Sequence, residues 1–254
     1  MTASTLSRKL TPTVESRRVN LGDGAATTLR VARFDRREFD LRVVAIDPCA
    51  TLLAWCAANR AEHAIVGGFY MRPGGPPLGD VWIDGKARPV QAFDAPWDAE
   101  RACVHADGAE VAIRPRRELG EPHGDLLQAG PKLVGGRRTL IREGRDPEGF
   151  SAGARQFDSD ITDGRYPRAA LGIAGGELIA VVCEGRADEE AGLTMAELAR
   201  AMRELGAVEA INLDGGGSAS LVVGGALLNT PREEHGRELV GGREIATALQ
   251  FFPR

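Results

Sequence analysis

A short stretch near the C-terminal end, residues 211–218, restricts what this chain can fold into more than any other part of it. It reads Ile-Asn-Leu-Asp-Gly-Gly-Gly-Ser, and a second apolar run follows it at residues 221–223. Glycine adopts backbone conformations that are closed to other residues, and it lets a ligand approach the main chain. Three consecutive glycines therefore predict either a tight turn between two strands or a site in which Asp214 acts beside exposed backbone N–H groups.

The composition is that of an ordinary soluble globular protein. The chain has 254 residues, 43% hydrophobic and 27% charged, enough for one large domain or two small ones. Its net charge of −4 argues against a nucleic-acid binder or a polybasic membrane surface. No apolar run reaches the ~18 residues of a membrane span, and the N-terminus lacks the apolar core of a signal peptide. The four cysteines form no C-x-x-C pair, so we expect free thiols and a cytoplasmic protein.

No repeat, low-complexity segment or linker divides the chain, which favours a single domain. Residues 1–13 predict a flexible tail and residues 14–254 the domain. Residues 49–59 predict a helix, and residues 142–167 show no periodicity and predict a long loop. Strands are expected at 27–34, 41–46, 63–66, 80–83, 102–105, 110–113, 169–174, 178–183, 208–213, 220–223 and 245–251.

The most clearly marked helix lies between two of these strands. Thr194 and Glu197 form a capping-box pattern, in which a hydroxyl and a carboxylate satisfy free N–H groups reciprocally. Apolar residues keep helical spacing after them, and Gly206 ends the helix. Strand, helix and strand together resemble a parallel crossover unit, which places Asp214 just past the carboxyl end of a strand. The predicted fold class is α+β, a single domain with mixed β-sheets and a few packed helices.

Several common catalytic patterns are missing. Ser218 lacks the final glycine of a nucleophile elbow and precedes a strand. No phosphate loop ending in Gly-Lys-Ser/Thr occurs, and the four histidines are too scattered for a zinc site. Residues 158–164 resemble a calcium loop, but the glycine is one place late and Ala169 stands where a Glu is needed. We therefore expect no cofactor and no metal, with a divalent cation near Asp158 or Asp160 left open.

Five segments resemble the phosphodiester glycosidase family. Three of them, which follow one another in the second half of the chain, are 166–173 (YPRAALGI), 192–199 (GLTMAELA) and 212–220 (NLDGGGSAS). Two lie upstream and resemble the family's glycine-aromatic loop and its Ala-Gly-Pro turn, namely 67–70 (GGFY) and 128–133 (QAGPKL). The resemblance covers roughly residues 45–252 and is strongest from 168 to 220. Where the family usually has an asparagine before its glycine-aromatic pair, this chain has Val66 and Gly67.

The resemblance implies a hydrolase that cleaves the glycosidic bond of a sugar-1-phosphodiester and releases a sugar and a phosphomonoester. Cleavage at the sugar carbon passes through an oxocarbenium-like state that a carboxylate stabilises, and Asp214 is the candidate. The phosphomonoester has a second pKa near ~6 and leaves as an anion, so an anion clamp matters more than a strong acid. Arg168 and the N–H groups of residues 215–218 suit that clamp, and Asn212 suits a sugar hydroxyl.

The expected catalytic residues are Asp214, Arg168 and Asn212. The expected substrate-binding residues are Gly67, Gly68, Phe69, Tyr70, Gly215, Gly216, Gly217 and Ser218. The expected partner is a small-molecule or oligosaccharide phosphodiester, with no nucleic acid and no membrane, and the oligomeric state stays open. Two alternatives remain at this point: a non-catalytic carbohydrate- or phosphate-binding module, and a metal-assisted phosphodiesterase that uses Asp158, Asp160 and Asp214.

Overall fold

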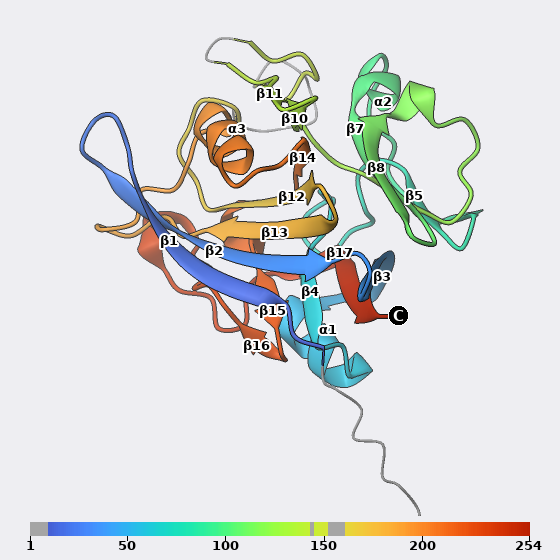
Figure 1. The fold of residues 1–254 in the computed structure, drawn as a ribbon, viewed down its shortest axis with the longest axis horizontal. Helices are drawn as coiled ribbons and strands as arrows, with labels where there is room; N and C mark the ends of the chain where they lie inside the picture. The colour runs from blue at the N-terminus through green and yellow to red at the C-terminus, as the bar shows by residue number, and fades with distance from the viewer. Residues whose placement is uncertain (1–9, 143–144, 152–160) are drawn as a thin grey trace, which may run out of the picture.

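A computed structural model describes residues 10–142, 145–151 and 161–254, and its strands form three sheets (Figure 1). The largest sheet contains β1 (Thr13–Asn20), β2 (Ala26–Asp35), β10 (Lys132–Gly135), β11 (Arg138–Thr139), β12 (Arg168–Ala174), β13 (Glu177–Cys183) and β14 (Glu209–Asn212). Their order is β1-β2-β13-β12-β14-β10-β11, and each strand is antiparallel to its neighbour.

The other two sheets have five strands each. The second contains β3 (Phe39–Thr51), β4 (His63–Val66), β15 (Leu221–Val223), β16 (Ala226–Leu227) and β17 (Glu244–Pro253), in the order β16-β15-β4-β17-β3. The third contains β5 (Val81–Ile83), β6 (Lys86–Ala87), β7 (Ala102–Asp107), β8 (Glu110–Pro115) and β9 (Asp125–Gln128), in the order β6-β5-β9-β7-β8. This third sheet is the green lobe of Figure 1.

The helices are short. They are α1 (Leu52–Asn59), α2 (Trp97–Glu100) and α3 (Met195–Glu204), with 3-10 turns η1 (Arg116–Glu118), η2 (Gly216–Ser218) and η3 (Glu234–Gly236). Among the described residues, no helix has both the length and the apolar character that a bilayer span requires. The arrangement of packed sheets and few helices confirms the predicted α+β class.

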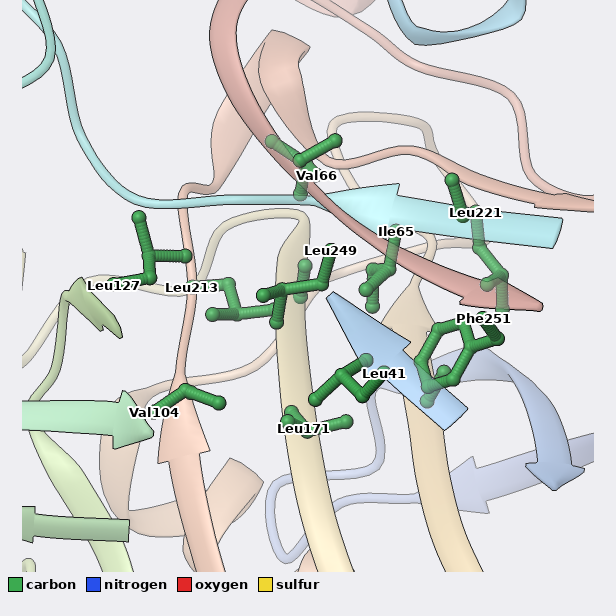
Figure 2. Close-up of a cluster of buried hydrophobic side chains, with 14 of the residues drawn as sticks. Leu41, Ile65, Val66, Val104, Leu127, Leu171, Leu213, Leu221, Leu249 and Phe251 are labelled. Carbon is green, nitrogen blue, oxygen red and sulfur yellow. The ribbon is translucent and has the colours of Figure 1, made fainter. Parts of the chain in front are cut away.

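The first two sheets share a core, and the outer face of the first sheet packs on α3. Leu171 of β12 lies in the shared core with Ile65 of β4 and Leu249 of β17 (Figure 2). The next residue back along β12, Ala170, points the other way and packs with Met202 of α3. Because both faces of β12 and β13 are covered, these strands read as continuous apolar runs instead of alternating ones.

The predicted crossover unit is confirmed and delivers Asp214 to the edge of the core. The hydroxyl of Thr194 accepts from the N–H of Glu197, and the Glu197 carboxylate accepts from the N–H of Thr194, so α3 begins with the predicted capping box. Both β13 and β14 are antiparallel to β12, which lies between them, so the two strands run in the same direction. Asp214 follows the carboxyl end of β14.

The helix predicted at residues 49–59 is shorter than expected. Strand β3 continues to Thr51, which pairs with β17, and helix α1 begins only at Leu52. Pairing with a strand nearly 200 residues further along the chain decides this boundary, and the local pattern did not show it. Cys49 therefore lies on a strand and Cys56 on the helix, and all four cysteines are free, as predicted.

Two predictions fall mainly outside the described residues. Of the predicted tail at 1–13, only the last few residues are described, and β1 already begins at Thr13. Asp158 and Asp160, the alternative cation ligands, lie within residues 152–160, which are also outside the described part. The division into a flexible tail and a single domain stays a prediction.

Candidate active site

The glycine loop that follows β14 connects the first sheet to the second. The N–H of Asp214 donates to the carbonyl oxygen of Gly67 at the end of β4, at 2.9 Å. The N–H of Gly216 donates to the carbonyl oxygen of Pro167, just before β12, at 2.8 Å. These two bonds fix the loop between a strand end of each sheet, and they hold the Asp214 backbone in place.

Close neighbours explain why this loop contains glycine. Gly216 has a φ of +59°, a conformation that disfavours residues with a Cβ. A Cβ on Gly217 would lie 2.9 Å from the Leu239 side chain and 3.0 Å from a guanidinium nitrogen of Arg243. The two interpretations of the glycine run, a tight turn and a site, are therefore compatible, because the same glycines make the turn and let side chains from elsewhere reach it.

The carboxylate of Asp214 is the centre of a small polar network. It is half-buried, accepts from the N–H of Gly215 at 2.9 Å, and hydrogen-bonds to the hydroxyl of Ser218. The same Ser218 hydroxyl interacts with the phenol oxygen of Tyr70, whose own hydroxyl donates to the carbonyl oxygen of Glu244 at 2.6 Å. Ser218 therefore orients the Asp214 carboxylate, and Tyr70 lies beside this pair.

Burial raises the pKa of Asp214 above its usual value, because a low-dielectric environment disfavours the charged form. The hydrogen bond from Ser218 and the positive charges of Arg243 and Arg72 act in the opposite direction and moderate the rise. Burial likewise raises the pKa of Tyr70, and the nearby charge of Asp214 adds to it. The Asp214 carboxyl group therefore exchanges its proton closer to neutral pH than a free aspartate does.

Two arginines and a second carboxylate border the glycine loop. Arg243 donates to one carboxylate oxygen of Glu233 through Nε at 2.9 Å and Nη2 at 2.5 Å, and its Nη1 lies 3.4 Å from the Ser218 hydroxyl. Arg186 lies 3.6 Å from the other oxygen of Glu233, and a Cβ on Gly216 would lie 3.5 Å from its guanidinium. Glu233 therefore holds two guanidinium groups beside the loop.

A third arginine is exposed. Arg72 lies two residues after Tyr70 in the chain, and its positive charge lowers the pKa values of Asp214 and Glu233, as a nearby cation does. Within the described ranges, its guanidinium forms no ion pair. Arg186 has an unusual backbone as well, with φ at +59°. Such a conformation in a residue other than glycine costs on the order of 1–3 kcal/mol and concentrates at functional sites.

Arg168, the predicted anion clamp, binds the protein itself. Its side chain is buried, and its Nε donates to the carbonyl oxygen of Leu193 at 2.9 Å. Its Nη2 donates to the carbonyl oxygens of Ile161 and Gly164, each at 2.7 Å, and its guanidinium lies 5.1 Å from the centre of the Tyr166 ring. These contacts brace the segment that precedes β12, and the predicted catalytic role of Arg168 stays a prediction.

Asn212 is tied to the Ala-Gly-Pro turn. Its amide nitrogen donates to the carbonyl oxygen of Gly130 at 2.9 Å, and the N–H of Gly130 returns a bond to the Asn212 carbonyl oxygen at 3.0 Å. The buried side-chain oxygen of Asn212 has no hydrogen-bond partner among the described residues. The carboxylate of Glu148 lies against the same turn, and burial raises its pKa to about 7. Asn212 is therefore a buried link between β14 and this turn, and its expected catalytic role stays a prediction.

Of the predicted substrate-binding residues 67–70, Gly67 contacts the backbone of Asp214, and only Tyr70 lies beside its carboxylate. The N–H of Gly67 donates to the carbonyl oxygen of Thr247 at 2.9 Å, and the N–H of Gly68 donates to the Thr247 hydroxyl at 3.0 Å. Phe69 packs into a separate apolar cluster. A Cβ on Gly67 would lie 2.4 Å from the Thr247 hydroxyl oxygen, and one on Gly68 would lie 2.8 Å from the carbonyl oxygen of Gln128. Gly67 thus permits close packing on β17, and Gly68 permits close packing on β9.

Of the four loop N–H groups predicted to form an anion nest, those of Gly215, Gly216 and Ser218 have partners inside the protein. Gly215 donates to the Asp214 carboxylate, and Gly216 donates to Pro167, as described above. Ser218 donates to the carbonyl oxygen of Gly215 at 3.2 Å. These three N–H groups are therefore already occupied by protein acceptors. The binding role of residues 215–218 stays a prediction.

Residues 59–252 match the phosphodiester glycosidase family. The chain belongs to the phosphodiester glycosidase family. The match includes every residue of the Asp214 network, and it confirms the resemblance found in the sequence.

A curated relative of this phosphodiester glycosidase domain comes from Mus musculus. It is N-acetylglucosamine-1-phosphodiester alpha-N-acetylglucosaminidase, 31% identical over 177 residues, which are 66% of this chain and 32% of the relative. The chain thus spans about a third of the length of that relative.

Two solved structures have the same fold. The catalytic domain of zebrafish N-acetylglucosamine-1-phosphodiester alpha-N-acetylglucosaminidase, auto-inhibited by its pro-peptide, has a TM-score of 0.73 and 18% identity, and the match covers 98% of this chain and 85% of that one. A hypothetical protein from Synechocystis has a TM-score of 0.66 and 20% identity, with 96% of this chain and 62% of that one covered. At these identities the likeness shows the fold alone.

Several residues around the glycine loop of this phosphodiester glycosidase family member were not among the site residues expected from the sequence. They are Arg72, Arg186, Glu233 and Arg243, together with Thr247, which holds the glycine pair. They come from four separate parts of the chain, and no motif joins them. The one local signal is that Arg243 follows a Gly-Gly pair, but in a chain with 32 glycines such a pair does not single out a site.

Proposed function

We propose that this protein hydrolyses the glycosidic bond of a sugar-1-phosphodiester and releases a sugar and a phosphomonoester. The observation that carries the proposal is one carboxyl group with a raised pKa, that of Asp214, bordered by three arginines, Arg72, Arg186 and Arg243. Membership in the phosphodiester glycosidase family supports the same reaction class. The Asp214 carboxylate can stabilise the sugar cation of the reaction, and the arginines can bind the phosphate anion.

Asp214 acts on the sugar side of the bond. As the bond between the anomeric carbon and the phosphate oxygen lengthens, positive charge develops on the sugar ring, and an adjacent carboxylate stabilises it. The hydrogen bonds from Gly215 and Ser218 hold this carboxylate in one orientation before substrate arrives. Water then adds to the sugar carbon, and its proton passes to the carboxylate or to the departing phosphate.

The arginines act on the phosphate side. Arg72, Arg186 and Arg243 face two carboxylates, Asp214 and Glu233, so the cluster keeps a net positive charge that attracts an anion. Burial alone would raise the pKa of Glu233, but hydrogen bonds from Arg243 and the arginine charges together lower it. Glu233 therefore stays ionised and holds Arg243 in place.

Arg72 and Arg186 are the better candidates for direct contact with phosphate. Arg243 already donates two hydrogen bonds to Glu233, whereas Arg72 is exposed and Arg186 makes a single long contact with Glu233 and one bond to a backbone carbonyl oxygen. Guanidinium groups bind phosphate through charge-assisted pairs of hydrogen bonds. We assign the anion clamp to these two arginines instead of Arg168, whose Nε and Nη2 donate to carbonyl oxygens.

Hydrolysis in oxygen-18 water tests the reaction. A panel of glycosyl phosphodiesters that differ in the sugar is incubated with the protein, and the products are separated and weighed by mass spectrometry. The proposal expects the label in the sugar. Label in the phosphate, with activity lost on adding a chelator, would establish the metal-assisted phosphodiesterase. Binding of the diesters with no turnover of any of them would establish the non-catalytic module.

Among the described residues, no three His, Cys, Asp or Glu side chains gather closely enough to hold a metal ion. The cytoplasmic location expected from the sequence stays a prediction.

A further inference from the structure

Two exposed apolar side chains lie next to the arginines of the site in the chain. Val240 is 99% exposed and Met71 is 45% exposed, and they are two of the four exposed large hydrophobic residues in the described part of the protein. Met71 immediately precedes Arg72, and Val240 lies three residues before Arg243. Of the other two, Val14 lies on β1 and Leu140 directly follows β11.

The loops that carry Met71 and Val240 meet at the end of β3. The carbonyl oxygen of Gly75, in the first loop, accepts from the thiol of Cys49 at 3.8 Å. A Cβ on Gly241, in the second loop, would lie 3.3 Å from the Thr51 hydroxyl oxygen. Cys49 and Thr51 are the last residues of β3 and stand two positions apart. Both loops therefore cover the same strand end.

The loop that carries Val240 is anchored on both sides. The side chain of Leu239 packs against Gly217, and its N–H donates to the carbonyl oxygen of Pro231 at 2.9 Å. The N–H of Gly242 donates to the carbonyl oxygen of Leu239 at 3.0 Å. Hydrogen bonds therefore fix the turn that contains Val240 beside the glycine loop, and the Val240 side chain projects from this turn into solvent.

From this placement we propose that Met71 and Val240 form an apolar rim that binds the alcohol portion of the substrate, and that this alcohol carries an alkyl or aryl group next to the phosphate. The inference rests on the proposed function, which places the sugar at Asp214 and the phosphate at the arginines. The alcohol lies on the far side of the phosphate from the sugar, where Met71 adjoins Arg72. An apolar alcohol removes both side chains from water, which is favourable in proportion to the area covered.

The test uses two phosphomonoesters, hexyl phosphate and glycerol phosphate, as probes of the leaving group. They have the same charge and differ in the polarity of the alcohol. Their affinities for the protein are measured by isothermal titration calorimetry, together with those of Val240→Ser and Met71→Gln. Val14→Ser and Leu140→Gln make the same chemical changes at exposed apolar positions away from the site and serve as matched controls.

We expect the protein to bind hexyl phosphate about tenfold or more tightly than glycerol phosphate, since each buried CH₂ contributes roughly a factor of four. Val240→Ser and Met71→Gln reduce this preference severalfold and leave the affinity for glycerol phosphate unchanged. The two control variants keep the full preference. Equal affinity for both probes, or an equal loss of preference in the control variants, would overturn the apolar rim.

These outcomes are independent of turnover. Failure of every glycosyl phosphodiester in the oxygen-18 experiment would overturn the proposed reaction, while the probe affinities still report on the apolar rim. A protein that hydrolyses such diesters but binds both probes equally keeps the proposed reaction and loses the apolar rim.

Discussion

Near Gly215 of the glycine loop, Arg168 is buried and donates to backbone carbonyl oxygens that belong to three different residues. Near Gly217 of the same loop, Arg243 is half-buried, donates to the carboxylate of Glu233, and reaches the hydroxyl of Ser218. Carbonyl dipoles satisfy a guanidinium inside the protein and fix it as a brace. A carboxylate that is shared with a second arginine instead leaves positive charge close to Asp214. Arg168 therefore has a structural role beside the loop, whereas Arg243 and Arg186 supply positive charge near Asp214.

The largest expected effect is at Asp214 itself. Asp214→Asn keeps the shape of the side chain but removes the charge that stabilises the sugar cation, so we expect kcat on a cleaved glycosyl phosphodiester to fall by about 10³-fold or more. The unfolding free energy, measured by urea denaturation, stays near that of the unmodified protein. Activity close to the unmodified level would remove Asp214 from the catalytic step.

The next test replaces each of the two arginines, Arg168 and Arg243, with alanine. Arg168→Ala leaves buried carbonyl oxygens without donors, so we expect the free energy of unfolding to fall by about 3 kcal/mol. Arg243→Ala removes the link between Glu233 and Ser218, and we expect kcat/KM to fall by about 100-fold with a smaller loss of stability. Urea denaturation and steady-state kinetics on both variants provide the comparison, in which each variant is the control for the other. The reverse pattern would show that Arg168 is the clamp.

A smaller effect is expected at Gly217. Its Cβ position lies 3.0 Å from Arg243 and 3.1 Å from Glu233, so Gly217→Ala pushes this ion pair aside. We expect kcat/KM to fall by about tenfold, because misplacement of a positioned group weakens catalysis. Gly176→Ala, at a turn with no atom within 4 Å of the added Cβ, is the matched control. Equal activity in the two variants would show that the ion pair does not position the site.

The smallest effect concerns pH. The charge of Arg243 lowers the pKa of Asp214 against the effect of burial. Replacement of Arg243 by Gln therefore raises this pKa, and the ionised form that stabilises the sugar cation is lost at a higher pH as acid is added. We expect the acidic limb of the kcat profile to move upward by about one pH unit. A limb that stays in place, or moves downward, would mean that another group controls it.

The sequence alone determined the part of this protein that depends on neighbours along the chain. The capping box of Thr194, the apolar runs of β12 and β13, and the position of Asp214 after β14 were all predicted, because helix caps and strand patterns act over a few residues. The glycine run already singled out the loop that carries Asp214, and the family resemblance came from the same kind of local segment.

Only the tertiary structure decided which side chains meet Asp214. Arg243 directly precedes β17, which pairs with β4, and it binds Glu233 beside the loop. Tyr70 reaches the loop from the segment that follows β4. Arg168 is adjacent to the same loop but is bound to carbonyl oxygens, which a sequence pattern does not reveal. The physical reason is that charge acts through space, so the roles of these arginines depend on what the fold places beside each guanidinium.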